Sequence, residues 1–372
     1  MPKPNTPKIA IVHDWIYGGG AEKVVEQLHT LYPEAPIYTS YCSDNWRKRL
    51  DNKVITGYLQ HPPFRQLRKF LPLLRQWWFA HLDLSDFDIV ISSSGNGEAK
   101  FAGQAKSNHN KPTHINYCHT PVHFYWRHYE TYLQNPGIKP QWLARLGLKL
   151  LINPLRNRDY RAAQNVDIFV ANSSHIQSDI KAFYNRDASV IHPPVDTKRF
   201  INHSKVKRSG FVTLGRQVPM KKTDLIIKAC NKTNSQLTVV GVGPEHEYLK
   251  SIAGPTIKFE TNASDKDLIN LLSQASGFIF ASFEDFGIAP VEALACGTPV
   301  IAYQAGGALD YVIPDKTGDF FTKQTTESIV EAITKFTPSK YDSWQIQKFA
   351  SSFDKNHFRN KISKLINDSY KS

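Results

Sequence analysis

The sequence of 372 residues lacks long apolar runs and paired cysteines, and it is short of acidic side chains. No stretch of about eighteen apolar residues occurs, so no segment is expected to cross a membrane as a helix. The N-terminal MPKPNTPK leads into a short apolar segment and not into the core of a signal peptide, which favours a cytoplasmic protein. The four cysteines are scattered, without a C-x-x-C pair or the Cys/His spacing of a zinc site, so free buried thiols are expected.

Basic residues outnumber acidic ones by 46 to 33, which gives a formal net charge of +13. Such an excess indicates an anionic partner: nucleic acid, an anionic membrane surface, or a substrate that carries a pyrophosphate. No RNP, helix-turn-helix or zinc-finger pattern accompanies the charge, so a nucleic-acid partner is not expected. The apolar fraction of 41% and the aromatic fraction of 12% are typical of a folded chain, and the length suffices for two domains.

The most informative stretch runs from Phe278 to Phe321. Apolar runs at 278–280 and 300–303 stop at loop residues and restart after about the length of a crossover helix, which is typical of a parallel sheet. Glu284 follows the first of these strands, and Glu292 lies eight positions further on, inside the next predicted helix. Because ligands bind outside the carboxyl ends of strands in open α/β sheets, we expect both carboxylates at one crevice.

The two acids suit a ligand that carries hydroxyl groups. A carboxylate has only acceptor sites, so one acid is suited to a ribose and the other to a sugar. The Phe286-Gly287 turn and the helix after it present free backbone N–H groups, which favour a phosphate between the acids. Taken singly, Glu284 is typical of a solvated loop acid and Glu292 of a residue that complements the helix dipole. Together with the surrounding glycine turns, they favour a ligand site.

A glycine triplet, Gly18 to Gly20, follows a predicted strand at 9–12 and precedes an amphipathic helix. Glycine lets the backbone approach a ligand closely, although a flexible turn is the alternative interpretation. The spacing is not G-x-G-x-x-G, so a nicotinamide-binding fingerprint is disfavoured. His119 ends another predicted strand, where a lone histidine is more often structural.

Arg216 ends a predicted strand at 210–216, and Lys221 follows shortly after it. Arginine offers a bidentate fork to phosphate and lysine a compact charge, while ordinary surface cations are the alternative.

Short strands that alternate with helical stretches predict a doubly wound parallel sheet in each half, and the paired prolines at 193–194 predict a domain junction. The other predicted strands are 36–39, 87–92, 114–117, 168–171, 189–192, 237–240 and 257–260.

Two stretches combine basic and apolar residues in a way that is typical of surfaces that dock on an anionic bilayer. The first is 61–78, and the second is 141–161. For both stretches, a core-facing helix with a solvated outer face is the alternative. In the first stretch the basic residues are Arg65, Arg68, Lys69 and Arg75.

The run E-D-F-G-I-A-P-V-E-A-L-A-C-G-T-P-V-I-A-Y, which starts at Glu284 and is followed by G-G-A-L-D, resembles the E-x7-E signature of glycosyltransferase family 4. This is a family of retaining GT-B enzymes, and the sequence of the motif is most similar to that of its bacterial polysaccharide mannosyltransferases. The resemblance implies two Rossmann-like, doubly wound parallel-sheet domains that face a central cleft. Residues 1–194 would form the acceptor-side domain and 195–353 the donor-binding domain, with a C-terminal helix at about 354–372 crossing back onto the first domain.

The resemblance also implies roles for particular residues. Glu292 would hold ribose hydroxyls and Glu284 the hydroxyls of the donor hexose. The run G-R-Q-V-P-M-K-K-T-D resembles the diphosphate clamp of the family. The residues with implied catalytic roles are His119, Glu284, Arg216 and Lys221. The residues with implied roles in binding the nucleotide sugar are Glu292, Gly19, Gly20, Phe286, Gly287 and Ile288.

The expected activity is the transfer of a hexose, with retention at the anomeric carbon, from a nucleotide sugar to a lipid-linked or polysaccharide acceptor. The similarity of the motif to mannosyltransferases favours mannose from GDP-mannose, and UDP-glucose or another UDP-sugar is the alternative. The family's usual Phe-x-Gly is replaced here by Phe259-Glu260-Thr261, which leaves the base open. No metal and no cofactor is expected, and the protein is expected at the inner face of the cell membrane. Two alternatives of another class are a catalytically silent membrane-associated scaffold and a basic nucleic-acid-binding protein.

Overall fold

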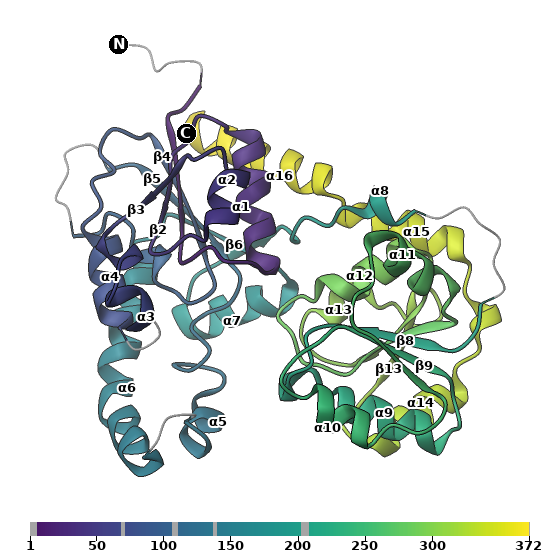
Figure 1. Cartoon of the computed structure of the whole chain (residues 1–372). Coiled ribbons are helices and arrows are strands. Elements are labelled where there is room, and N and C mark those ends of the chain that lie inside the picture. Colours follow the sequence, from purple (N-terminus) through teal and green to yellow (C-terminus); the bar gives the residue numbers. More distant parts are fainter. Residues whose placement is uncertain (1–5, 68–70, 106–110, 137–139, 202–207, 372) are drawn as a thin grey trace. The chain divides into compact units, whose positions relative to one another are not determined.

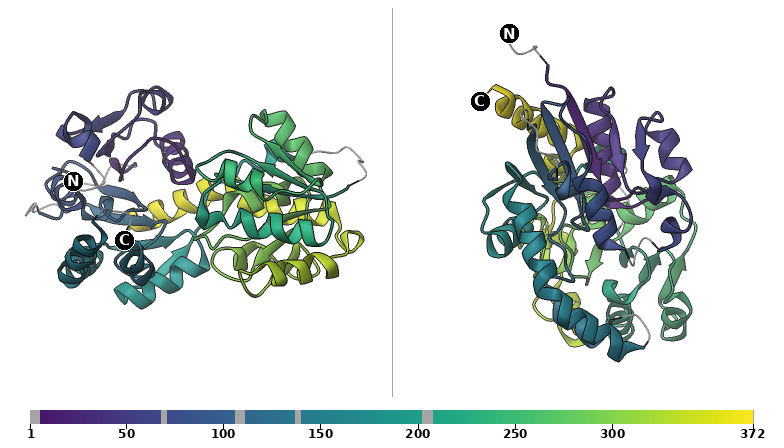
Figure 2. Two further views of the ribbon diagram at one scale, coloured as in Figure 1. Left: turned by 60° about the horizontal axis from the view of Figure 1, so that its bottom comes forward. Right: turned by 90° about the vertical axis from the view of Figure 1, so that its left-hand side faces the viewer.

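The computed structural model describes residues 6–67, 71–105, 111–136, 140–201 and 208–371. The chain divides into two compact units (Figure 1). Unit 1 comprises Met1–Pro193 and Arg359–Ser372, and unit 2 comprises Pro194–Phe358. Each unit holds one parallel sheet with helices on both faces (Figure 2), which confirms the prediction of two doubly wound α/β domains.

The sheet of unit 1 has the order β3-β2-β1-β4-β5-β6-β7, and all of its pairings are parallel. β1 is buried along its whole length, because its apolar residues pack against helices on both faces. The strand order reverses between β1 and β4, so the loops after these two strands flank a switch point, where such sheets bind ligands. The strands are β1 (Ile9–His13), β2 (Ile37–Thr39), β3 (Val54–Thr56), β4 (Ile89–Ser94), β5 (Thr113–Cys118), β6 (Ile168–Ala171) and β7 (Ala188–Val190).

The helices of unit 1 follow from local sequence signals. In α1, Val24, Val25 and Leu28 lie on one face and are buried. α7 begins after Ser173, whose side chain accepts a hydrogen bond from Ile176 N, as an N-cap does. The α-helices are α1 (Gly20–Leu31), α2 (Asp44–Arg49), α3 (Phe64–Leu67), α4 (Pro72–Ala80), α5 (Tyr129–Gln134), α6 (Gln141–Gln164), α7 (Ser174–Tyr184) and most of α16 (Lys355–Lys371), whose first four residues belong to unit 2.

A buried ionic cluster joins three elements of unit 1. Lys100 Nζ lies 2.6 Å from Asp159 Oδ1, and the two side chains are 2% and 0% exposed. Asp159 Oδ2 accepts hydrogen bonds of 2.8 Å from Tyr184 Oη and from Trp126 Nε1. The cluster therefore ties α6 to α7 and to the short helix η3 (Ala99–Phe101), with each buried charge paired.

The stretch 61–78 differs in part from its predicted role as a continuous docking surface. Arg75, in α4, is buried; its Nη2 lies 2.7 Å from Glu98 Oε1, and its guanidinium stacks over the ring of Trp15. It is therefore unavailable to a membrane, because the face of α4 that carries it packs inward. Arg68 and Lys69 lie outside the described residues. The sequence analysis also missed β3, a short strand at the edge of the sheet.

The sheet of unit 2 has the order β10-β9-β8-β11-β12-β13 and is also parallel. Its order reverses between β8 and β11, where Phe278 pairs with Val212. The predicted strands 237–240, 257–260 and 300–303 are confirmed. The strands are β8 (Phe211–Leu214), β9 (Leu237–Val240), β10 (Ile257–Glu260), β11 (Gly277–Phe280), β12 (Val300–Tyr303) and β13 (Gly318–Phe321).

The helices of unit 2 pack on both faces of this sheet around one continuous core. α11 starts with a capping box, in which Ser264 and Asp267 satisfy each other's backbone N–H groups. The α-helices are α8 (Thr197–Phe200), α9 (Thr223–Lys232), α10 (His246–Ser251), α11 (Asp265–Gln274), α12 (Ile288–Ala295), α13 (Ala308–Tyr311), α14 (Thr326–Lys335) and α15 (Ser343–Ala350).

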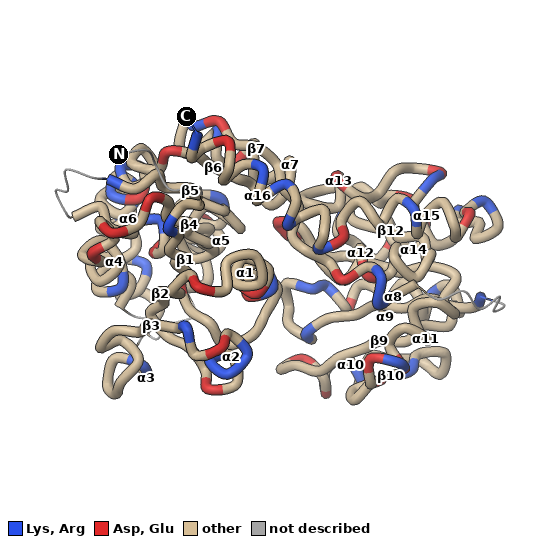
Figure 3. Tube along the Cα trace, turned by 90° about the horizontal axis from the view of Figure 1, so that it is seen from above, with Lys and Arg blue, Asp and Glu red and all other residues tan. Residues whose placement is uncertain are grey.

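Charged residues of both signs are interspersed over each unit (Figure 3), so the excess of basic residues is not confined to one region. Across the described parts of the chain, no helix combines the length and the apolar character needed to span a membrane.

Candidate active site

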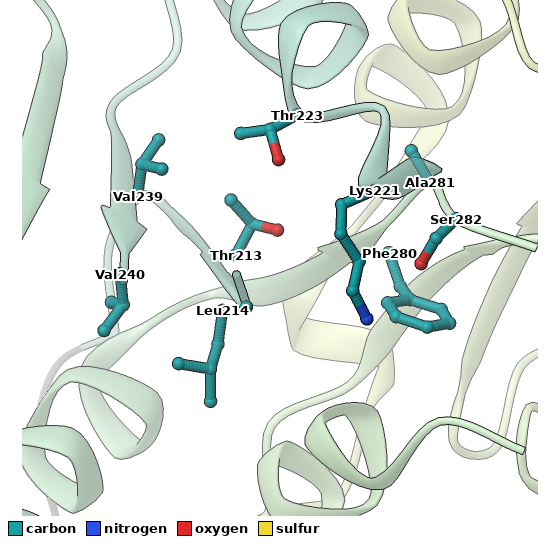
Figure 4. A pocket seen from close by; sticks show the side chains of 10 residues that line it. Thr213, Leu214, Lys221, Thr223, Val239, Val240, Phe280, Ala281 and Ser282 are labelled. Atoms are coloured by element: carbon teal, nitrogen blue, oxygen red, sulfur yellow. The ribbon is translucent and has the colours of Figure 1, made fainter. Parts of the chain in front are cut away.

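A small pocket lies at the switch point of the unit 2 sheet, at the carboxyl ends of β8 and β11 (Figure 4). Open α/β sheets bind their ligands at this position. Its lining combines hydroxyl groups, one amino group and apolar side chains. The lining residues are Thr213, Leu214, Gly215, Lys221, Thr223, Val239, Val240, Phe280, Ala281 and Ser282.

Lys221 and Glu284, 63 positions apart in the sequence, form an ion pair beside this pocket. Their side chains are 30% and 27% exposed, and Ser282 Oγ donates a 3.0 Å hydrogen bond to Glu284 Oε1. The side chain of Lys221 passes over Gly215, where a Cβ would lie 3.7 Å from Lys221 Cε. The pocket therefore offers an ammonium group for an anion, and the carboxylate paired with that group can accept from hydroxyl groups; both side chains are within reach of solvent.

Gln217 holds the loop that carries Arg216, and the sequence analysis did not single it out. Its side chain is buried; Nε2 donates to Gly241 O at 2.6 Å, and Oε1 lies 2.7 Å from His246 Nδ1. These bonds fix the turn after β8 against the turn after β9, and the Arg216 side chain extends from this anchored turn into solvent. No local sequence signal marks Gln217, because its partners come from a separate strand and helix.

The glycine pair Gly306-Gly307, which opens the G-G-A-L-D run, supports the backbone of Glu284. Gly307 N donates a 2.9 Å hydrogen bond to Glu284 O. Gly306 has a φ of 64°, and a Cβ there would lie 2.3 Å from the same carbonyl oxygen. Both the left-handed backbone and the close approach require glycine. Any larger residue at Gly306 would displace the loop that carries Glu284.

The N-terminus of α12 lies next to Tyr311, another residue that the sequence analysis missed. Gly287 precedes the helix with a φ of 91°, and a Cβ there would lie 2.8 Å from Tyr311 Oη. This hydroxyl is buried and has no hydrogen-bond partner among the described residues. Burial raises the pKa of Tyr311 well above its usual value, so the group stays a donor. Ile288 begins the helix, whose first-turn backbone N–H groups have no acceptor within the helix.

Glu292 lies within α12, as predicted, and is partly buried. It does not line the pocket described above. The structure therefore pairs Lys221 with Glu284, and it places Glu292 on the helix that begins beside them.

His119 follows β5 directly, as predicted for unit 1. Its Nε2 lies 2.8 Å from Ser93 Oγ, and its ring stands edge-on to that of His13, with 6.3 Å between centroids. Burial, and to a smaller extent the neighbouring His13, lowers the pKa of His119 to about 3. The imidazole is thus neutral near pH 7 and acts as a hydrogen-bonding group, not as a cation.

The predicted glycines Gly19 and Gly20 lie at the switch point of unit 1, where Gly20 begins α1. Glu22, which the sequence analysis missed, is buried below them and accepts hydrogen bonds from the backbone N–H groups of Tyr17 and Gly18. Asp14, also missed, is buried and accepts three backbone N–H bonds of 2.6 to 2.8 Å from the loop after β4. Both carboxylates fix the loops that flank this switch point.

Solved structures share the fold of the whole chain. The Anabaena protein HepE, crystallised with UDP-glucose, matches with a TM-score of 0.70 and 17% identity over 98% of this chain and 100% of its own. The sucrose-phosphate synthase of Thermosynechococcus elongatus matches with a TM-score of 0.72 and 17% identity over 97% and 98% of the two chains. Two Rossmann-like domains with these neighbours define a protein of the GT-B class.

Family models locate the chain more narrowly within this class. The model "Glycosyltransferase Family 4" matches residues 18–199, and the model "Glycosyl transferases group 1" matches residues 194–357. The two matches adjoin and together cover nearly the whole chain. Both halves of the chain thus match glycosyltransferase models, the N-terminal half that of family 4.

Curated relatives are similar over part of their length. One is a GDP-mannose-dependent alpha-(1-6)-phosphatidylinositol monomannoside mannosyltransferase of Mycolicibacterium smegmatis, 26% identical over 46% of this chain and 53% of its own. Another is the corresponding enzyme for the monoacylated substrate in Corynebacterium glutamicum, 30% identical over 40% and 47%. The chain thus matches about half the length of these relatives.

Proposed function

We propose that this chain is a retaining glycosyltransferase that moves a hexose from a nucleotide diphosphate sugar to a lipid-linked or polysaccharide acceptor. The observation that carries the proposal is the Lys221–Glu284 pair beside the switch-point pocket. A nucleotide diphosphate sugar presents an anionic diphosphate to the ammonium group and sugar hydroxyls to the carboxylate. One ligand of this kind therefore provides a partner for both the Lys221 ammonium group and the Glu284 carboxylate.

Unit 2 supplies the donor-binding groups in this proposal. Lys221 and Arg216 neutralise the charge that develops on the departing diphosphate as the bond to the hexose breaks. The backbone N–H groups at 286–288, at the start of α12, add further donors to the same phosphate oxygens. Glu284 accepts hydrogen bonds from the hexose and Glu292 from the ribose.

Unit 1 contributes three of the predicted residues. We assign a contact with the hexose to His119, whose imidazole is neutral and therefore adds no charge near the anomeric centre. Gly19 and Gly20 are assigned to the diphosphate and the acceptor, because glycine backbone admits a close approach.

The donor is proposed to be GDP-mannose, since both mannosyltransferase relatives are named as GDP-mannose-dependent. A UDP-sugar is the second candidate, and the binding of UDP-glucose by HepE favours it. No metal and no further cofactor forms part of the proposal. The acceptor is proposed to lie at the inner face of the cell membrane.

Thermal unfolding with GDP, UDP, GDP-mannose and UDP-glucose tests the proposal. A nucleotide present at about 100 times its Kd stabilises the folded protein by about 2.7 kcal/mol. Stabilisation by GDP and not by UDP supports the first donor, and the reverse result supports the second. If neither nucleotide stabilises the protein, while mixed-sequence DNA binds at physiological salt, the glycosyltransferase proposal is wrong. NMR of the product's anomeric proton then tests retention.

A further inference from the structure

The helix α6 has two halves that differ in burial. Its C-terminal half carries the buried positions Ile152, Asp159, Ala162 and Ala163, which pack into unit 1. Residues 141–151, by contrast, include no buried position. In Figures 1 and 2 this end of α6 projects away from the sheet of its unit together with α5. The core-facing interpretation of 141–161 therefore holds only for the second half of the helix.

The projecting half of α6 exposes large apolar side chains. Trp142, Leu146 and Leu150 recur every four residues, so they form one stripe along the helix. Side chains of this size are normally buried, and a group of them in solvent marks an interaction surface. The exposed fractions are 66% for Trp142, 52% for Leu143, 47% for Leu146, 68% for Leu150 and 53% for Leu151.

Arg145 holds the projecting end together as a helical hairpin. Its Nε donates a 3.1 Å hydrogen bond to Leu133 O, and its Nη2 donates a 2.8 Å bond to Gln134 O, at the end of α5. Tyr132, on α5, is 41% exposed and adds an aromatic ring to the same end. We call this structure, residues 129–134 with 141–151, the α5–α6 tip.

The charged side chains that α6 exposes to solvent are all basic. Its only acidic residue, Asp159, is buried and paired with Lys100. Lys149, Arg158 and Arg161 are exposed. Two of these, Arg158 and Arg161, lie on the turns that follow the apolar stripe. Along the helix axis, the apolar end is thus followed by Arg158 and Arg161, which we call the basic collar.

We propose that the α5–α6 tip docks on an anionic lipid bilayer. From Trp142 to Leu150 the helix rises about 12 Å, comparable with the depth of about 5–10 Å at which interfacial elements enter the headgroup and acyl boundary. Tryptophan prefers that boundary, and the basic collar, which begins about 12 Å beyond Leu150 along the helix axis, then faces the lipid phosphates from the water side. The order of apolar end and basic collar matches the layers of a bilayer leaflet.

This inference does not depend on the proposed transfer reaction, so the two can fail separately. It also replaces 61–78 as the main candidate for a membrane surface, because Arg75 of that stretch is buried. A bilayer is favoured over a second copy of the chain because the exposed charges on α6 are all positive and outnumber the exposed acid of α5, Glu130, so two such tips would repel each other.

Sedimentation of the full chain with vesicles tests the proposal. The chain is expected to bind vesicles of phosphatidylcholine with phosphatidylglycerol more tightly than phosphatidylcholine alone, and added salt weakens the binding. The variant Trp142→Ser/Leu150→Gln should lose about tenfold or more in binding, since two apolar side chains no longer enter the lipid. Trp344→Ser is the matched control, because Trp344 on α15 is also 66% exposed. It should bind like the unchanged chain.

Labelling gives a second measurement that is specific to the tip. The four native cysteines are buried, so Leu146→Cys provides a single accessible thiol for an environment-sensitive dye. Its emission should shift to the blue with phosphatidylglycerol vesicles, whereas a dye at Trp344→Cys should not respond. The proposal is overturned if the dye at position 146 does not respond or if the double variant binds as before. It is also overturned if Trp77→Ser alone abolishes binding, because Trp77 is an exposed residue of the stretch 61–78. Loss of a dimer in the double variant, without any lipid binding in the unchanged chain, also overturns it.

Discussion

Replacing Lys221 with alanine separates the ligand-binding role of the Lys221–Glu284 pair from a structural one. About a third of each side chain is exposed, and ion pairs of this kind contribute about 0–1 kcal/mol to stability. The free energy of unfolding should therefore change by less than about 1 kcal/mol. A charge-assisted hydrogen bond to a diphosphate is worth about 1.5–3 kcal/mol, so the affinity for the nucleotide should fall about 10- to 150-fold.

Isothermal titration with the nucleoside diphosphate that stabilises the protein best measures the affinity, and urea unfolding measures the stability. Lys228→Ala is the matched control within unit 2. Lys228 Nζ lies 2.8 Å from Asp224 Oδ2, and these side chains are 40% and 23% exposed, which resembles the exposure of the first pair. Lys228 does not line the switch-point pocket, so its loss should leave the nucleotide affinity unchanged.

Two results would refute this reasoning. If Lys221→Ala lowers the affinity no more than Lys228→Ala does, the pair is not part of a diphosphate site. If Lys221→Ala instead lowers the free energy of unfolding by several kcal/mol, the ion pair is mainly a structural element of unit 2.

Three further predictions concern the fold. Burial lowers the pKa of His114 to about 4 from about 6.5 in the unfolded chain, so stability is lost as the pH falls through this window. Between about pH 7.5 and pH 5 His114 should account for a loss of about 2 kcal/mol, and His114→Gln should reduce the total loss in urea unfolding by this amount. His119 and His123, whose pKa values burial also lowers, account for further loss over the same window. Asp159→Asn leaves Lys100 buried without its charge partner and should cost about 3–5 kcal/mol in the same assay. Gly306→Ala should cost about 1–3 kcal/mol and weaken nucleotide binding, whereas Gly147→Ala, with open space around it inside α6, should stabilise by up to about 1 kcal/mol.

Each of these predictions has a contrary outcome. An unchanged pH profile in His114→Gln would mean that other groups cause the acid sensitivity. Full stability of Asp159→Asn would show that water reaches the ammonium group of Lys100. Equal effects of alanine at positions 306 and 147 would contradict the close approach at Glu284.

Much of the fold could be predicted because buried parallel strands leave a strong signal. Strands such as β9 and β12 are apolar runs that stop at glycine or polar turns, and their predicted bounds were confirmed. β3 was missed because three residues at a sheet edge, one of them exposed, carry neither a long apolar run nor an alternation. Its assignment depends on pairing with β2, which local sequence does not encode.

The candidate site was predictable where a residue's role depends on its place at a strand end. Glu284, Lys221 and His119 all follow strands, as expected. Gln217 and Tyr311 were not predictable. The contacts of the buried Gln217 amide, and the surroundings that leave the Tyr311 hydroxyl without a partner among the described residues, come from elements that lie elsewhere in the sequence. The roles assigned to the site residues remain predictions that the nucleotide experiments test.

The sequence by itself determined the class of this protein: two parallel α/β domains, and a motif that resembles one glycosyltransferase family. Periodicity and short motifs are local properties, so they can be recognised in the sequence without any knowledge of packing. Only the tertiary structure decided which charges meet and which face solvent. It joined Lys221 to Glu284 across 63 positions, buried Arg75, and exposed the apolar end of α6. Which face of a helix packs inward depends on the elements around it, and composition alone does not fix that.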